Sequence, residues 1–147
     1  MDQAVYEKLK EVARLRYESE VGQGLITYGD VGRLINLDPS TEEFYWKIGG
    51  VVGEISAQEY RHGRPLLSAV VVNKDTREPG EGFFRLLCSL DFGDCSHKSA
   101  CDNTRHYCPK KDKLKSIWSA WHGVVIRDLD EAWISELNKV YDYWSSH

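Results

Sequence analysis

Apolar residues recur at helical spacing near both ends of this chain of 147 residues. Near the start, the pattern predicts an amphipathic helix over residues 2–19, with an apolar stripe of Tyr6, Leu9, Ala13 and Tyr17. Near the end, Asp128 and Glu131 form a capping pattern for a helix whose apolar side holds Trp133, Leu137, Val140, Tyr141 and Trp144. We expect this second stripe to hold the last helix firmly against a core.

The middle of the chain predicts two further helices that are joined by a short turn. Thr27, with Asp30 three residues later, has the pattern of an N-cap for a short helix whose apolar side holds Val31, Leu34 and Ile35. Residues 36–39 form its exit. Ser40 and Glu43 then have the pattern of a capping box for a longer helix, which runs to about Tyr60 and has Phe44, Ile48, Val51, Val52 and Ile55 on its apolar side.

The following residues lose this helical periodicity. A run rich in β-branched residues at positions 66–72 predicts a buried strand, and a turn with Gly and Pro follows at 75–82. Residues 83–90 fit either a short helix or a strand. The polar residues 91–115 predict a long loop or insertion. A short helix and a short strand are expected after it, over residues 117–121 and 124–126.

The order helix, turn, helix, strand and turn over residues 24–84 is that of a winged-helix module, which often presents a helix to a DNA groove. We therefore expect an α+β fold: a winged-helix-like centre with a small β-sheet, flanked by the N-terminal and C-terminal amphipathic helices. The length fits a single domain over residues 1–147. The hydrophobic content of 41% and the aromatic content of 12% argue against disorder.

The overall charge limits the kind of nucleic-acid binding that is expected. A net charge of -4 weighs against non-specific coating of nucleic acid, which depends on many lysines and arginines, although a local basic patch stays open. No apolar run approaches the roughly 18 residues that span a bilayer, and the charged first segment is unlike a signal peptide. We expect a cytoplasmic protein without a membrane partner.

Three short segments are similar to one known family: Thr27–Val31 at the opening of the first motif helix, Ile48–Gly50 inside the second, and Val70–Asn73 before a glycine-containing turn. Residues 24–82 resemble the DNA-binding domain of O6-alkylguanine-DNA alkyltransferases and their alkyltransferase-like relatives. In that family a tyrosine contacts the phosphate of the flipped nucleotide, an arginine fills the gap in the duplex, and a cysteine accepts the alkyl group. Flipping of this kind makes a buried reactive centre accessible.

Carried over residue by residue, the resemblance keeps the tyrosine as Tyr28 but puts Trp46 at the position of the arginine and Ser68 at that of the cysteine. The family's proline, histidine and arginine around the cysteine correspond to Leu67, Ala69 and Val70. A serine among aliphatic residues lacks a base that could activate it, so alkyl transfer is not expected and no catalytic residue is assigned. Alkyltransferase-like proteins bind lesions without any transfer.

The function expected from the resemblance is therefore non-enzymatic DNA binding of the alkyltransferase-like type. Trp46 could act as a wedge between bases, and a core position is the other interpretation of this residue. The expected DNA-binding residues are Tyr28, Trp46, Lys47, Arg61 and Arg64. The alternative function is a protein-interaction or regulatory module that binds no nucleic acid and meets its partner through a Cys/His-containing loop.

All four cysteines, Cys88, Cys95, Cys101 and Cys108, fall in one polar stretch together with His97 and His106. These residue types are the preferred ligands of zinc, which would order such a loop. However, the cysteines are separated by six, five and six residues, whereas zinc knuckles have roughly two to four residues between paired ligands. Zinc, a disulfide such as Cys95–Cys101 and free thiols all remain open, so no metal site or cofactor is assigned.

A metal-dependent nuclease is the least favoured function. Glu54, Lys74, Asp75 and Glu81 are the residues from which such a site would be built. Charged residues at helix ends and in turns are ordinarily solvated, and this set lacks the spacing of a nuclease motif. The sequence therefore leans away from an enzyme.

Overall fold

The computed structural model describes residues 1–15, 24–80, 83, 86 and 129–147. Their elements, in chain order, are α1 (Gln3–Leu15), β1 (Ile26–Thr27), α2 (Tyr28–Leu34), α3 (Phe44–Arg61), the 3₁₀ helix η1 (Leu67–Val70), β2 (Val71–Val72) and α6 (Leu129–Ser145). The mixed α+β class is confirmed at this level. The cysteines, His97, His106 and the elements expected over 87–128 lie outside the described residues.

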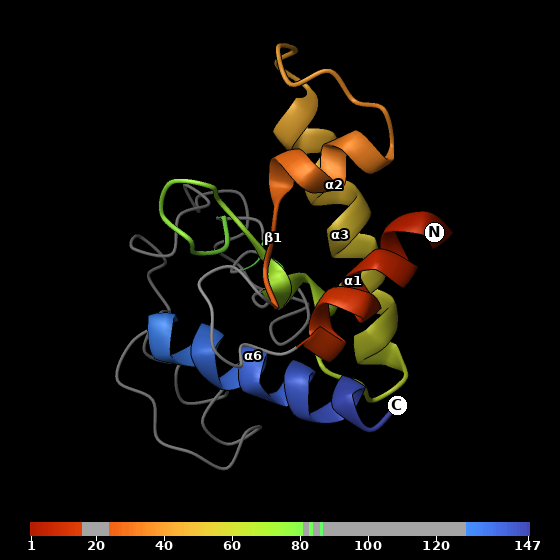
Figure 1. Cartoon of the computed structure of the whole chain (residues 1–147), viewed down its shortest axis with the longest axis vertical. Coiled ribbons are helices and arrows are strands. Elements are labelled where there is room, and N and C mark those ends of the chain that lie inside the picture. Colours follow the sequence, from red (N-terminus) through yellow and green to blue (C-terminus); the bar gives the residue numbers. More distant parts are fainter. Residues whose placement is uncertain (16–23, 81–82, 84–85, 87–128) are drawn as a thin grey trace, which may run out of the picture.

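The helices surround the segment that carries η1 and β2. Figure 1 shows α6 crossing the lower part of the molecule with α1 lying on it, while α3 leads away towards α2 at the other end. The two strands form a parallel pair in which Ile26 is the partner of Val71 and Thr27 that of Val72. None of the described helices combines the length and the apolar character needed to cross a bilayer.

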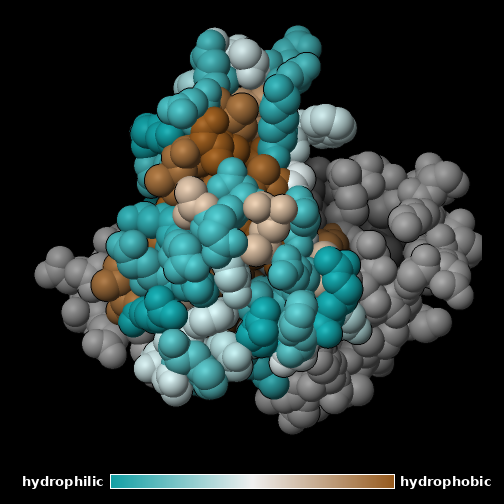
Figure 2. Space-filling view, turned by 90° about the vertical axis from the view of Figure 1, so that its right-hand side faces the viewer, coloured by the Kyte–Doolittle hydropathy of each residue, from teal (hydrophilic) through white to brown (hydrophobic). Residues whose placement is uncertain are grey.

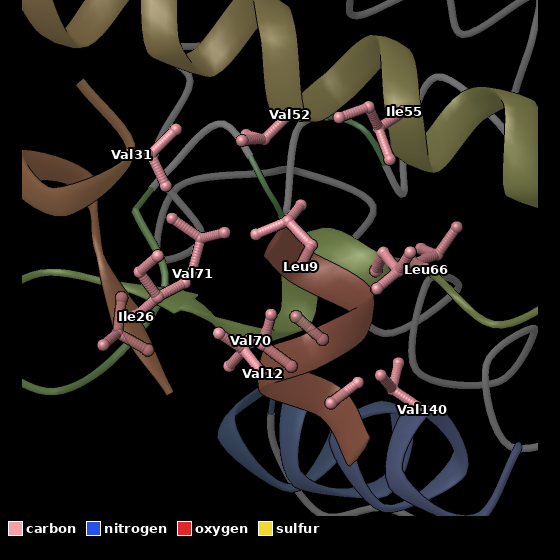
Figure 3. Packing of buried hydrophobic residues seen from close by; sticks show 14 of the residues in the cluster. Leu9, Val12, Ile26, Val31, Val52, Ile55, Leu66, Val70, Val71 and Val140 are labelled. Carbon is pink, nitrogen blue, oxygen red and sulfur yellow. The ribbon is translucent and has the colours of Figure 1, made fainter. Parts of the chain in front are cut away.

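The core is built around residues 66–72, which are all buried. Figure 3 shows Leu9 and Val12 of α1, Val52 and Ile55 of α3, and Val140 of α6 arranged around this segment; α1 and α6 are distant from it in the sequence. The apolar stripe predicted for α6 is confirmed, because Trp133, Leu137, Val140, Tyr141 and Trp144 are all buried.

The strand expected over 66–72 is wrong for most of its length, since residues 67–70 form η1 and only Val71 and Val72 form a strand. The reason is that β1 offers just two residues for pairing. Side chains satisfy several of the remaining backbone groups. Glu136 accepts from the Leu66 amide at 2.7 Å, Ser56 accepts from the Ser68 amide at 2.8 Å, and the Trp133 indole donates to the Ala69 carbonyl at 2.9 Å.

The predicted cap of α2 is confirmed, but that of α3 is wrong. Thr27 Oγ1 accepts a hydrogen bond from the Asp30 amide at 3.1 Å, as expected. At α3, the helix begins at Phe44 without any side-chain cap, because Ser40 bonds to the Asp38 carboxylate through both its amide and its hydroxyl. Asp38 thus forms a local turn that competes with the capping box. Leu34, expected on the apolar side of α2, is 40% exposed.

Candidate nucleic-acid interface

The expected DNA-binding residues fall into two groups at opposite ends of α3. Trp46 and Lys47 lie in its first turn, with Tyr28 nearby at the start of α2, whereas Arg61 ends the helix and Arg64 follows it. A rise of about 1.5 Å per residue puts Arg61 roughly 22 Å along the axis from Trp46. These five residues therefore do not form one site, and each end has to be considered separately.

The first turn of α3 presents aromatic side chains to solvent. Trp46 is 78% exposed, which removes the alternative that it belongs to the core, and Tyr45 beside it is 62% exposed. The Tyr45 ring makes edge contacts with Phe44 at 5.1 Å and with Tyr28 at 6.4 Å between centroids. The sequence analysis missed Tyr45. The run of three aromatic residues at 44–46 could have indicated it. Successive helical positions point in different directions, so these three side chains cannot all face the core, and only Phe44 does.

Tyr28 connects this aromatic turn with a distant part of the chain. The side chain is only 9% exposed, and its hydroxyl accepts a hydrogen bond from the Gly80 amide at 2.8 Å. Burial raises the pKa of the Tyr28 hydroxyl above its usual value, while the bond from Gly80 acts in the opposite direction. A Cβ atom added at Gly80 would lie 3.2 Å from the Tyr28 hydroxyl, so glycine suits this close approach.

The cations nearest to Trp46 are paired with carboxylates. Lys47 Nζ lies 2.8 Å from Glu43 Oε2, and this partner holds the pKa of Glu43 below its usual value. On α2, Arg33 pairs with Asp30. Exposed ion pairs are weak in water, so Lys47 can exchange Glu43 for a phosphate at little cost. The positive charge available at this end of α3 is nevertheless small.

The turn of residues 73–80, which follows β2, carries two further cations, Lys74 and Arg77, together with two carboxylates, Asp75 and Glu78. It is closed by hydrogen bonds from the Asn73 amide to the Glu78 carbonyl at 2.8 Å and from the Arg77 amide to the Asn73 carbonyl at 2.9 Å. Lys74 is exposed and Arg77 partly so, and neither makes an ion pair within the described part of the chain. Figure 1 shows this turn, in green, projecting beyond β1.

Arg77 has a backbone φ of 58°, in the left-handed region that glycine adopts more easily. For a residue with a Cβ, this conformation costs on the order of 1–2 kcal/mol. The turn therefore carries a charged side chain at a position where glycine would be more stable. Backbone strain of this kind is often found at functional sites.

The other end of α3 has a structural role. Arg64 forms two hydrogen bonds with Glu59, at 2.8 and 2.9 Å, which raise the pKa of Arg64 above its usual value. Glu59 is only 1% exposed and also accepts from the Tyr6 hydroxyl at 3.0 Å. Arg64 is therefore occupied in neutralising a buried carboxylate. Arg61 is exposed and makes no ion pair among the residues that are described.

Ser68, at the position of the family's cysteine, is buried at 4% exposure. The Ser56 hydroxyl donates to Ser68 Oγ at 2.6 Å and accepts from the Ser68 amide at 2.8 Å. In the described part of the structure, no ionisable side chain bonds to either hydroxyl. This pair satisfies the Ser68 amide of η1 and offers no activated oxygen.

The residues of the nuclease alternative are dispersed as far as they are described. Glu54 lies 3.4 Å from the amino group of Met1, whereas Lys74 and Asp75 belong to the turn after β2, and Glu81 is outside the described residues. No group of three or more His, Cys, Asp or Glu side chains suited to a metal ion occurs within the ranges that the structure describes.

Comparison of the chain with protein-family models, with curated proteins and with solved structures finds no match in any of the three.

Proposed function

We propose that the chain is a non-enzymatic DNA-binding protein of the alkyltransferase-like type, in which the first turn of α3 meets DNA. A winged-helix-like arrangement is supported by the order of α2, α3, β2 and the turn after it. The observation that carries the proposal is the 78% exposure of Trp46 next to the exposed Tyr45.

Two adjacent aromatic side chains that are exposed to water are better suited to stacking on a ligand than to packing in the core. Trp46 contributes little to the core, so its apolar surface is available for a ligand. Stacking of a base on an aromatic side chain contributes about 1–3 kcal/mol, and large side chains can also wedge between base steps. The interface is therefore expected to favour DNA in which a base is unstacked, damaged or unpaired.

The electrostatics support a modest salt dependence. The net charge is -4, and Lys47 and Arg33 both carry carboxylate partners. Each phosphate contact contributes about one unit to the slope of log K against log salt concentration. We expect a slope of roughly two to four, smaller than that of a strongly basic DNA-binding protein.

Fluorescence anisotropy with labelled oligonucleotides tests the proposal. The ligands are single-stranded DNA, a matched duplex and a duplex that contains O6-methylguanine, each at two salt concentrations. Trp46→Ala should weaken binding roughly tenfold, as expected from the loss of one stacked base. Ile134→Ala on α6 is the control, because it removes another exposed apolar side chain. Absence of binding at micromolar protein and low salt would refute the proposal, as would unchanged affinity in Trp46→Ala.

A protein partner is the second candidate, and one observation favours it. Figure 2 shows an apolar area in the upper part of the molecule, bordered by hydrophilic residues. Leu34 at the end of α2 is exposed. Ile35 and Leu37, which lie between α2 and α3, and Val51 on α3 are partly buried. Such areas often mark protein contacts. Sedimentation velocity of the wild type and Leu34→Asp over a concentration series tests self-association, which the substitution should abolish if this area forms the contact.

A further inference from the structure

We propose that Tyr28 is a positioning residue that holds the turn of residues 73–80 beside the first turn of α3, so that Lys74 and Arg77 contact the same DNA as Trp46. This inference rests on the proposed function. It adds a second binding element and assigns Tyr28 a role that differs from the one implied by the family resemblance.

The geometry around Tyr28 supports a connecting role. Its ring makes an edge contact with Tyr45, the neighbour of Trp46, with 6.4 Å between centroids. Its hydroxyl accepts from the Gly80 amide at the end of the turn, at 2.8 Å. One buried side chain thus touches both the aromatic turn of α3 and the end of the turn of residues 73–80, which are more than 30 positions apart in the sequence.

The resemblance assigns a tyrosine at this position to direct contact with a phosphate. In this chain the Tyr28 side chain is 9% exposed, which leaves little of it accessible to a phosphate, and its hydroxyl oxygen accepts from the Gly80 amide. The tyrosine therefore acts through the turn that it holds.

The turn itself is suited to phosphate contact. Its two closing hydrogen bonds, between Asn73 and both Glu78 and Arg77, give it a defined shape. Lys74 and Arg77 carry no carboxylate partner among the described residues, in contrast to Lys47 and Arg33. Arg77 also has a left-handed φ of 58°, a strained conformation that is often found at functional sites. The aromatic turn then supplies stacking, and Lys74 and Arg77 supply positive charge beside Asp75 and Glu78, which bring the net charge of the turn to zero.

Tyr28→Phe is the variant that separates this role from general packing. It retains the ring and its contact with Tyr45 but removes the oxygen that accepts from Gly80. In amide hydrogen exchange followed by NMR, we expect the Gly80 amide to exchange at least tenfold faster. Tyr143→Phe on α6 is the control for the chemical change, because it removes a phenolic hydroxyl outside the proposed interface. In the Tyr143→Phe variant, the Gly80 amide should exchange at the wild-type rate.

The DNA readout is the salt slope, measured with the O6-methylguanine duplex. Lys74→Gln and Arg77→Gln should each lower the slope by about one, because each removes one phosphate contact. Tyr28→Phe should lower it by up to two, and adding either glutamine substitution to Tyr28→Phe should change it little further. The loss caused by Trp46→Ala should remain the same in the Tyr28→Phe background.

Three results would overturn the inference. Unchanged Gly80 exchange in Tyr28→Phe would rule out the connecting role of Tyr28, and an unchanged salt slope in Lys74→Gln and Arg77→Gln would rule out the turn of residues 73–80 as a binding element. In either case DNA binding that still depends on Trp46 would leave the proposed function intact. Absence of DNA binding by the wild type would instead refute the proposed function and this inference together.

Discussion

The carboxylate of Glu59 is almost fully buried at 1% exposure and is held by Arg64 through two hydrogen bonds of 2.8 and 2.9 Å. The Tyr6 hydroxyl of α1 donates to the same carboxylate at 3.0 Å. This cluster joins α1, the end of α3 and the segment that leads to η1. Breaking a buried pair is costly because one charge is left without compensation.

Arg64→Ala should therefore destabilise the protein by about 2–4 kcal/mol. Urea unfolding followed by circular dichroism measures the change. Arg61→Ala is the matched control, because Arg61 is exposed and its loss should change the unfolding free energy by less than about 0.5 kcal/mol. Equal effects of the two substitutions would contradict the structural role of Arg64.

The buried serine pair predicts an asymmetric effect of two similar substitutions. Ser56→Ala removes the acceptor of the Ser68 amide and the donor to Ser68 Oγ, whereas Ser68→Ala removes only the acceptor of the Ser56 hydroxyl. An unpaired buried polar group costs about 1–3 kcal/mol. Ser56→Ala should thus be the more destabilising variant in the same unfolding experiment. A larger effect of Ser68→Ala would show that the amide is satisfied in another way.

Relief of the strain at Arg77 should separate stability from binding. Arg77→Gly permits the φ of 58° without a Cβ and should raise stability by about 0.5–1 kcal/mol, after the greater freedom of glycine in the unfolded chain is subtracted. Arg77→Ala keeps the strain and removes the charge. Calorimetry should show a higher Tm for the glycine variant alone, and anisotropy should show weaker DNA binding for both. A lower Tm in Arg77→Gly would contradict the assignment of strain.

Two tyrosines predict a loss of stability at alkaline pH. The pKa of Tyr28 is raised by burial, and that of Tyr6 is raised by burial and by the hydrogen bond with Glu59. The folded state holds these protons more tightly than the unfolded state, in which tyrosine has a pKa near 10. Their contribution to stability is therefore complete below about pH 10 and is lost as the pH rises through the folded-state pKa values.

Urea unfolding between pH 7 and pH 11 tests this expectation against the phenylalanine variants. Tyr6→Phe and Tyr28→Phe should each show a shallower fall in unfolding free energy above about pH 10, because neither has the corresponding proton to lose. A wild-type slope in Tyr28→Phe would mean that burial does not perturb this hydroxyl.

Local patterns were sufficient to predict the helices α1, α3 and α6 and the Thr27 cap of α2. The apolar stripe of α6 and the bond from the Asp30 amide to Thr27 depend on residues within a few positions of one another, and periodicity reveals such relationships. The capping box at Ser40 failed although it is also local, because the neighbouring Asp38 carboxylate competes for the same serine.

For the candidate site, the sequence singled out Tyr28 and Trp46 as candidate residues but did not reveal what surrounds their side chains. From the sequence, Trp46 fitted a surface position and a core position equally well. The structure shows that Phe44 points into the core and that Trp46 points to solvent. The hydrogen bond of Tyr6 with Glu59 and that of Tyr28 with Gly80 depend on where separate segments meet, because they join residues 53 and 52 positions apart.

The same reason explains residues 66–72. An apolar run without alternation predicts burial, and all of these residues are buried. Whether such a run forms a strand depends on a pairing partner elsewhere in the chain, and β1 provides only two residues. Chain-local chemistry therefore specified the helices and the buried run. The 3₁₀ helix, the outward Trp46 and the two long-range polar contacts arise from packing, because each depends on groups that are brought together only when the chain folds.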